Sequence, residues 1–167
     1  MVMNPGIIIQ ARLGSSRFPR KVLQEINGKK LIDIVVDECK LTNLPVVVAM
    51  PIGDRELIDY ISPKCNVWLD YNENDVIGRY YRCAKKYGFD PVIRVTADAK
   101  RIKHELILQQ LENYNTYNHI CYGNFCEVFS FTQLEHYYHH DKRPNTREHV
   151  TMGMLQDMTV DYDIDLK

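Results

Sequence analysis

The chain lacks long hydrophobic runs, paired cysteines and a signal-like start. No apolar stretch approaches the roughly 20 residues that a membrane helix needs, and the first residues lack a basic region followed by an apolar stretch. The five cysteines are odd in number and include no Cys-x-x-Cys pair, so neither a disulfide framework nor a zinc ribbon is supported. We therefore expect reduced thiols, a cytoplasmic location and no membrane partner.

The sequence also lacks an excess of either positive or negative charge. The sequence has 21 lysines and arginines against 22 aspartates and glutamates, a net charge of -1. A protein that coats nucleic acid carries basic residues over a whole face, whereas here they cluster locally. No grouping of Ser, His and Asp at a nucleophile elbow is visible, which argues against a hydrolase. The expected partner is a small anionic molecule and not a nucleic acid.

Apolar strand-like runs alternate with helix-like segments along the first two thirds of the chain. This rhythm predicts an α/β domain with a mostly parallel central sheet flanked by helices, in which ligands bind beyond the carboxyl ends of the strands. Its 167 residues, 45% of them hydrophobic, suit a single domain over 1–167. The expected strands are Gly6–Gln10, Val46–Met50, Val67–Leu69 and Val92–Thr96, and the expected helices are Lys29–Lys40, Asp54–Ile61, Asn74–Tyr87 and Lys103–Asn113.

The rhythm becomes irregular after Asn113, where Tyr, His and Asn are abundant. We interpret 114–157 as an insertion on the same domain that contacts an acceptor molecule or a partner subunit. A final short strand is expected at Met158–Asp161. Within this region His136 and His140 lie one helical turn apart, but the Glu of a zincin motif is missing, so a polar helix end is the better interpretation.

The most informative segment is the loop that follows the first strand. Small residues there let a backbone approach a ligand closely and offer amide donors, and the neighbouring cations suit a polyphosphate. The Walker pattern is absent, because no Gly-Lys-Ser/Thr follows Gly14. The alternative is a solvated surface turn. The small residues are Gly14, Ser15 and Ser16, and the cations are Arg12, Arg17, Arg20 and Lys21.

This segment, with its Gln10-Ala11-Arg12, Gly14-Ser15, Arg17, Pro19, Lys21 and Val22-Leu23, resembles the sugar nucleotidyltransferases with a glycosyltransferase-A-like fold. It is most similar to the cytidylyltransferase group of spore-coat polysaccharide biosynthesis protein F and the CMP-sugar-acid synthetases. The resemblance implies a nucleotide-diphospho-sugar transferase fold. It also implies binding of nucleotide and phosphate by Gln10, Ala11, Arg12, Gly14, Ser15, Ser16, Arg17 and Lys21, while Arg20 occupies a variable position.

Two acidic residues are candidates for a metal site. Asp98 directly follows a predicted strand, which places it at the ligand edge of the sheet, and nucleotidyl transfer needs carboxylates that hold Mg²⁺ beside the phosphates. The resemblance implies that Asp98 and Asp161 bind this metal and that Arg12, Lys21 and Asp98 are catalytic. By themselves, Asp98 could be a turn former and Asp161 part of a solvated acidic tail.

Three further segments match the family. Asp75 is the first residue of an Asp-Val-x-x-Arg-Tyr stretch, and Asn74 or Asp75 is expected to cap a helix there, with contact to the nucleotide as the alternative for Asp75. Arg79 either reaches the pocket or pairs with an acid. Glu127, Arg147 and His149 fall in segments that the resemblance assigns to the acceptor, and a structural network among them is the alternative.

The sequence departs from the family pattern after the fourth strand. Where the family has Gly-Asp-Cys-Pro, this chain has Ala97-Asp98-Ala99-Lys100. The methyl group of Ala97 restricts the backbone if the site needs a positive φ, and Lys100 with Arg101 changes the local field.

The resemblance therefore implies a Mg²⁺-dependent enzyme that transfers CMP from CTP to a sugar or keto-deoxy sugar acid and acts as a homodimer. One alternative is a transferase that uses another nucleotide or a phosphorylated sugar or polyol. The other is a shortened, non-catalytic nucleotide-binding module.

Overall fold

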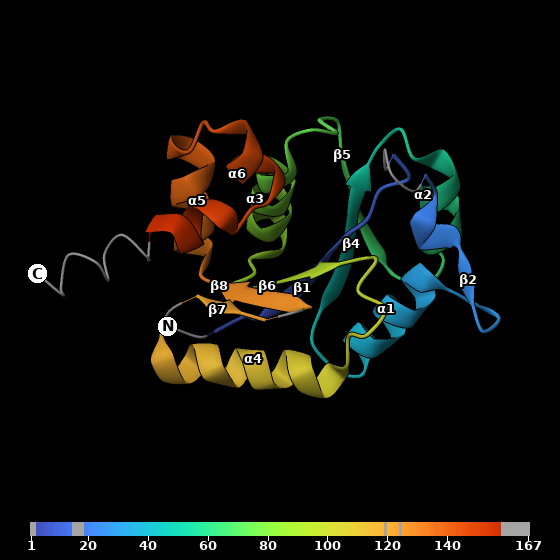
Figure 1. The fold of residues 1–167 in the computed structure, drawn as a ribbon, viewed down its shortest axis with the longest axis horizontal. Helices are drawn as coiled ribbons and strands as arrows, with labels where there is room; N and C mark the ends of the chain where they lie inside the picture. The colour runs from blue at the N-terminus through green and yellow to red at the C-terminus, as the bar shows by residue number, and fades with distance from the viewer. Residues whose placement is uncertain (1–2, 15–18, 119, 124, 158–167) are drawn as a thin grey trace, which may run out of the picture.

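The computed structural model describes residues 3–14, 19–118, 120–123 and 125–157, and a six-stranded sheet lies at its centre (Figure 1). The strand order is β5-β4-β1-β6-β8-β7. Neighbouring strands are parallel from β5 to β6, whereas β8 runs antiparallel to both β6 and β7. The strands are β1 Gly6–Gln10, β4 Val46–Pro51, β5 Asn66–Asp70, β6 Val92–Thr96, β7 Cys121–Tyr122 and β8 Cys126–Phe129. The expected α/β fold with a mostly parallel sheet is confirmed.

Helices cover both faces of this sheet. In Figure 1, α1 and α4 lie on one side of the sheet, and α3, α5 and α6 lie on the other. The helices are α1 Leu31–Lys40, α2 Arg55–Ile61, α3 Val76–Tyr87, α4 His104–Tyr117, α5 Phe131–His140 and α6 Pro144–Glu148. A short 3-10 helix, η1 Lys21–Leu23, and a small hairpin, β2 Glu25–Ile26 with β3 Lys29–Lys30, follow the first loop.

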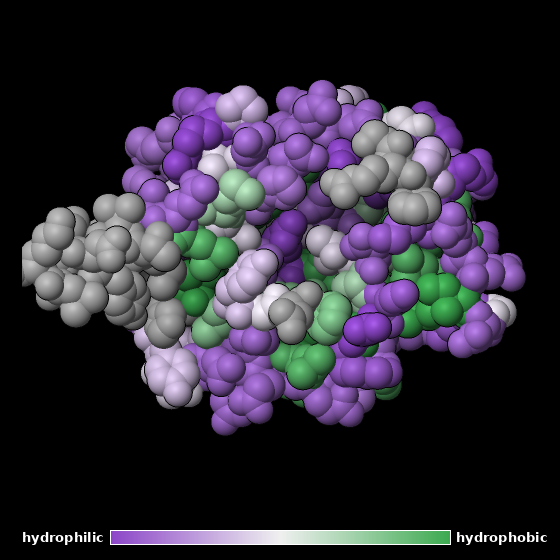
Figure 2. All heavy atoms as spheres, viewed as in Figure 1, coloured by the Kyte–Doolittle hydropathy of each residue, from purple (hydrophilic) through white to green (hydrophobic). Residues whose placement is uncertain are grey.

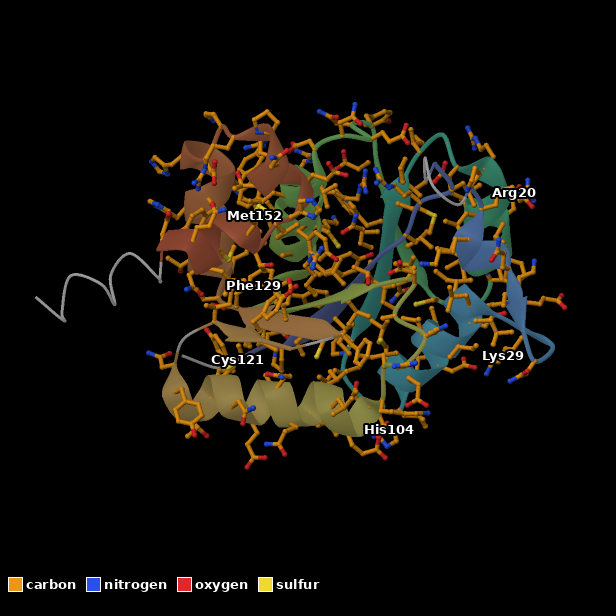
Figure 3. All side chains as sticks on the ribbon, in the orientation of Figure 1. Arg20, Lys29, His104, Cys121, Phe129 and Met152 are labelled. Atoms are coloured by element: carbon orange, nitrogen blue, oxygen red, sulfur yellow. The ribbon has the colours of Figure 1, made fainter. Side chains whose placement is uncertain are left out.

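The core forms because successive residues of a strand point to opposite faces of the sheet. Ile7 and Ile9 of β1 join the cluster that α1, α2 and α4 complete, whereas Ile8 joins the cluster under α3 and α5. Cys121 belongs to the cluster of Ile7 and Ile9, and Phe129 belongs to the cluster of Ile8; both side chains are labelled in Figure 3. All three isoleucines are fully buried, so β1 is a central strand with its carboxyl end directed at the loop of cations.

Some predicted boundaries are wrong. Lys29 and Lys30 form a strand paired with β2, and the helix begins only at Leu31. Helix α4 continues past Asn113 and ends at Tyr117, and the next residue, Asn118, caps it with a left-handed backbone that suits a helix end.

The irregular segment after Asn113 contains regular elements that the sequence analysis did not predict. Strand β8 is buried at all four of its residues and therefore shows no alternation of polar and apolar positions. Helix α5 begins with a capping box between Ser130 and Gln133. Two strands of the central sheet thus come from 114–157. The expected strand Met158–Asp161 lies outside the described residues.

Candidate active site

The carboxyl ends of β1 and β6 open into a pocket of about 290 Å³, which we call the central pocket. Figure 2 shows strongly hydrophilic side chains recessed near the middle of the face drawn there. Strands β1 and β6 are adjacent and parallel, so the segments that follow them meet at this edge. The pocket is lined by Gln10, Arg12, Lys21, Val22, Arg94, Thr96, Ala97, Asp98, Glu148 and His149.

Lys21 and Asp98 meet in this pocket. The Lys21 Nζ donates to Asp98 Oδ2 at 3.0 Å, and both side chains are nearly half exposed. Partial burial opposes ionisation of Asp98, but hydrogen bonds from Lys21 and Thr96 outweigh it, so the pKa of this carboxyl is lowered. Asp98 is therefore an anion at neutral pH, with its remaining oxygen lone pairs available to a cation or a donor.

Arg12 enters the same pocket from the loop after β1. Its Nη2 lies 3.4 Å from Glu148 Oε1 at the end of α6, in an ion pair that keeps about a third of the Arg12 side chain exposed. Hydrogen bonds fix the loop to β4 and to the start of α2. The amide of Ala11 donates to Ala49 O at 3.1 Å, and the amide of Leu13 donates to Asp54 Oδ2 at 2.7 Å. These two amides are thus occupied within the protein.

The remaining predicted residues of the loop lie at its margin. Gly14 is exposed, and a Cβ atom there would come within 2.8 Å of a carboxylate oxygen of Glu73, so the loop after β1 approaches the loop after β5 closely. Arg20 is paired with Glu56 and lies at the edge of the molecule, as Figure 3 shows. Ser15, Ser16 and Arg17 lie outside the described residues, as does the metal candidate Asp161.

A second pocket of about 450 Å³ adjoins the first, and we call it the outer pocket. It has Arg94 and His149 in common with the central pocket, so these two side chains form a shared wall. Figure 3 labels Met152 of this lining beside the α5 and α6 helices. The outer pocket is lined by Arg94, Tyr122, Glu127, His149, Thr151, Met152, Leu155 and Gln156.

Glu127 is the buried acid of the outer pocket. Its Oε2 accepts from Arg94 Nη1 and from the hydroxyl of Thr151, each at 2.8 Å. Burial opposes the charge on Arg94, but the nearby Tyr80 hydroxyl and Glu127 outweigh it and raise the pKa of the guanidinium. The Arg94 Nε and the Gln10 Oε1 are buried without a hydrogen-bond partner among the described residues. The lining of the central pocket, to which both residues belong, therefore has unused hydrogen-bonding capacity, which polar ligands or ordered waters satisfy in binding sites.

Arg147, which the resemblance assigned to the acceptor, lies outside both pocket linings. Its Nη2 donates to Asp75 Oδ1 at 2.7 Å, and its Nη1 donates to the carbonyl oxygens of Tyr138 and Asp141. These contacts join α6 to α3 and α5. The structure therefore brings Glu127 and His149 together and places Arg147 in a neighbouring structural network.

The loop before α3 is organised by buried charge. Asp75 caps α3 as expected, because its Oδ1 accepts from the amide of Gly78 at 3.3 Å. Arg79 is fully buried, and its Nη2 donates to the carbonyl oxygens of Asn72 and Glu73. Burial lowers the pKa of Arg79, and the nearby positive charge of Arg12 lowers it further. Arg79 thus supports the loop that faces Gly14.

The departure from the family pattern after β6 is accommodated without backbone strain at Ala97. Among the described residues, those with positive φ do not include Ala97, and its amide donates to Gln10 O at 2.9 Å. The methyl group is buried, while Lys100 and Arg101 are exposed.

Asp98 offers an oxygen ligand of the kind that Mg²⁺ prefers. Within the described part of the chain, the one group of three possible metal ligands lies elsewhere, on α1 and α4, and consists of Glu38, His104 and Glu105. His136 and His140 stack on each other in the last turn of α5, with ring centroids 4.6 Å apart. The described lining of the central pocket therefore contains no group of three such ligands, and Asp98 is its candidate metal ligand.

Sequence reasoning missed Arg94, Thr96, Glu148 and Thr151, which all line a pocket. Arg94 and Thr96 carried a signal, because they interrupt an apolar strand on alternate positions and so face one side of the sheet. Glu148 and Thr151 also carried a signal, because they belong to the Arg-Glu-His-Val-Thr segment 147–151 that matches the family, but only the fold shows their contacts with Arg12 and Glu127. No helix among the described residues is both long and apolar enough to cross a bilayer.

Comparison with known sequences gives the family. The family described as Cytidylyltransferase matches residues 6–160. The uncharacterized protein MJ1063 of Methanocaldococcus jannaschii is 32% identical over 156 residues, which make up 86% of this chain and 64% of that protein. A 3-deoxy-manno-octulosonate cytidylyltransferase of Blochmanniella floridana is 29% identical over 123 residues, 68% of this chain and 48% of that protein. The chain thus spans less than two thirds of these curated relatives.

Solved structures agree with the fold. A cytidylyltransferase from Leptospira borgpetersenii has a TM-score of 0.83 at 25% identity. The alignment covers 95% of this chain and 73% of the Leptospira protein. A CMP:2-keto-3-deoxy-manno-octonic acid synthetase complexed with CTP has a TM-score of 0.73 at 16% identity, with coverages of 93% and 86%, and shows the fold alone. Since the family match runs from the first strand past the last residue of both pockets, this chain belongs to the cytidylyltransferase family.

Proposed function

We propose that this protein transfers CMP from CTP to a sugar acid and releases pyrophosphate. The observation that carries the proposal is the meeting of Arg12, Lys21 and Asp98 in a central pocket that shares a wall with a second polar pocket. Two substrates that react with each other need two adjoining sites, one of which must neutralise a polyphosphate.

The central pocket suits the nucleotide. Arg12 and Lys21 supply positive charge at the edge where parallel sheets bind ligands, and Gln10 and Thr96 add hydrogen-bonding groups. Gly14, Ser15, Ser16 and Arg17 belong to the same loop, and we propose that they contact the phosphates as well. Lys21, held beside Asp98, is positioned to stabilise charge that builds up as pyrophosphate leaves.

We also propose a Mg²⁺ site at Asp98, completed by Asp161. The ionised state of Asp98 and its position beside Lys21 support this assignment. When bound, the metal supplies charge neutralisation on the phosphate oxygens. The chain's own residues orient the nucleotide and keep its α-phosphorus near the shared wall of Arg94 and His149.

The outer pocket suits the acceptor. Glu127, His149 and Thr151 offer fixed polar groups for sugar hydroxyls, and Arg94 with His149 offers donors to an anionic group. The relatives that bear the name 3-deoxy-manno-octulosonate cytidylyltransferase support a keto-deoxy sugar acid as the acceptor class. An acceptor hydroxyl would attack the α-phosphorus and lose its proton to solvent. The bond from the α-phosphorus to the oxygen that joins it to the β-phosphorus would break, and pyrophosphate would leave with that oxygen.

The test is pyrophosphate release with CTP, ATP, GTP or UTP, Mg²⁺ and 3-deoxy-manno-octulosonate as acceptor. We expect release with CTP above that with the other nucleotides and a loss of at least about 100-fold in Asp98→Asn, the size seen when a key electrostatic group is removed. Asp59→Asn, an exposed change on α2, is the control and retains full activity. Equal release with all four nucleotides, or none with CTP, contradicts the proposal.

We further propose a homodimer that uses 114–157. Strand β7 is an edge of the central sheet as described, and Tyr122 on it is 61% exposed, so this edge offers an aromatic side chain to a partner subunit. Sedimentation velocity measures the mass in solution, and a monomer at all concentrations contradicts the dimer.

A further inference from the structure

The short segment 148–151 connects the two pockets. At one end, Glu148 pairs with Arg12 of the central pocket. His149 lines both pockets, and at the other end the Thr151 hydroxyl donates to Glu127 of the outer pocket at 2.8 Å. Four consecutive residues thus touch the cation of one site and the buried acid of the other.

The backbone of this segment is strained at Val150. Its φ is 44°, in the left-handed region that β-branched residues avoid, and its side chain is buried in the core beneath α3 and α5. The turn is closed by amides of Thr151 and Met152, which donate to His149 O. Strain of this kind persists only where the surroundings impose it, and it concentrates at switches and binding sites. A displacement of Glu148 would therefore allow the strained backbone at Val150 to relax.

Glu148 and a bound phosphate would compete for the same guanidinium. Arg12, in the loop between β1 and Lys21, lines the central pocket, and its partner Glu148 lines the same pocket. Phosphate oxygens form stronger, bidentate hydrogen bonds with arginine, and they repel a carboxylate at short range. A polyphosphate in the central pocket would thus remove the partner that Glu148 has in this structure.

We infer that Glu148 is a positioning residue that holds Arg12 and the 148–151 turn in the arrangement of this structure, and that phosphate binding displaces it and reshapes the outer pocket. The inference rests on the proposed function, because it takes the central pocket as the phosphate site. Release of Glu148 frees the turn, and Thr151 then shifts against Glu127. The acceptor pocket reaches its binding arrangement after the nucleotide is in place.

The test compares the unchanged protein with Glu148→Gln and with Glu56→Gln. Glu56 forms the same kind of exposed pair with Arg20 outside both pockets, which makes it a matched control. Inorganic tripolyphosphate is titrated by calorimetry, and amide hydrogen exchange is followed at 149–152. We expect Glu148→Gln to bind tripolyphosphate about two- to fivefold more tightly, the range for loss of one partly exposed pair. The control keeps the original affinity.

Exchange separates positioning from a purely structural role. In the unchanged protein, tripolyphosphate should change exchange at 149–152, whereas in Glu148→Gln these amides should already exchange at the altered rate without ligand. Equal or weaker binding by Glu148→Gln, no response at 149–152, or no binding to any of the three proteins overturns the inference. Tripolyphosphate has no nucleobase, so its binding tests the phosphate site without testing the reaction. If these results are as expected but CTP is not turned over, only the proposed reaction is overturned.

Discussion

Lys21 and Asp98 lie 77 positions apart in the chain, and the fold brings Nζ within 3.0 Å of Oδ2. Because this pair stands at the centre of the proposed site, Lys21→Met should lower kcat/KM for CTP about 10- to 100-fold, the value of a charge-assisted hydrogen bond of about 1.5–3 kcal/mol. Steady-state kinetics measures this. Lys86→Met, an exposed change on α3, is the control, and an unchanged kcat/KM for Lys21→Met would contradict the assignment.

At this scale, motifs were sufficient to predict which residues share a pocket. The loop pattern points to Arg12 and Lys21, and the position after a predicted strand points to Asp98; the three line the central pocket, and their roles stay predictions. Glu148 was not, because the significance of its carboxylate lies in the 3.4 Å separation from Arg12, a contact between residues 136 positions apart. Arg147 was assigned to the acceptor by its motif, yet its contacts are with Asp75 and two carbonyl oxygens.

At the scale of elements, Glu38 joins α1 to the start of α4. A hydrogen bond from Lys103 is the largest cause that lowers its pKa to about 2; burial opposes this, and His104 adds to it. The folded pKa lies below the ordinary value of about 4.3, so the stabilisation is present above that pH and is lost as the pH falls towards 2. Glu38→Gln should therefore reduce the free energy of unfolding by about 1–2 kcal/mol at pH 7 and by less at pH 3.

Urea denaturation at the two pH values measures this difference. Glu112→Gln, an exposed change on α4, provides the control and should cost under about 0.5 kcal/mol at either pH. A cost for Glu38→Gln that does not shrink between pH 7 and pH 3 would show that the ion pair is not its cause.

The link between α6 and α3 allows a second prediction at this scale. Arg147→Met removes the hydrogen bonds to Asp75, Tyr138 and Asp141 and leaves Asp75 without this partner, which should cost about 2–3 kcal/mol of stability. Chemical denaturation measures it, with the exposed Arg101→Met as control. A raised KM for the acceptor with unchanged stability would instead support the binding role implied by the family resemblance.

At the scale of the whole molecule, binding of CTP with Mg²⁺ should stabilise the folded state. A ligand at 100 times its Kd adds about 2.7 kcal/mol, which for a chain of this size raises Tm by about 5–10 °C. Differential scanning fluorimetry with each nucleotide measures the shift. Stabilisation by CTP without pyrophosphate release would favour the non-catalytic nucleotide-binding module, whereas no shift with any nucleotide would contradict both.

The architecture was predictable because each parallel strand and its following helix leave a local pattern. Gly6–Gln10 and Val92–Thr96 are found as predicted, since buried strands are short apolar runs. The prediction of helix for Lys29 and Lys30 was wrong, because their pairing with β2 depends on tertiary contacts that leave no local pattern. The antiparallel β8 was hidden for a similar reason: Cys126–Phe129 shows its role only when it lies beside β6.

The wall that Arg94 and His149 form between the two pockets has a consequence for inhibitor chemistry. On the proposed function, a single compound that joins a cytidine phosphate to a sugar-acid mimic through a short tether would meet the second pocket at an effective concentration in the millimolar range once its first half is bound. Such a bisubstrate compound should bind far more tightly than either fragment, and the best tether length would report the thickness of that wall.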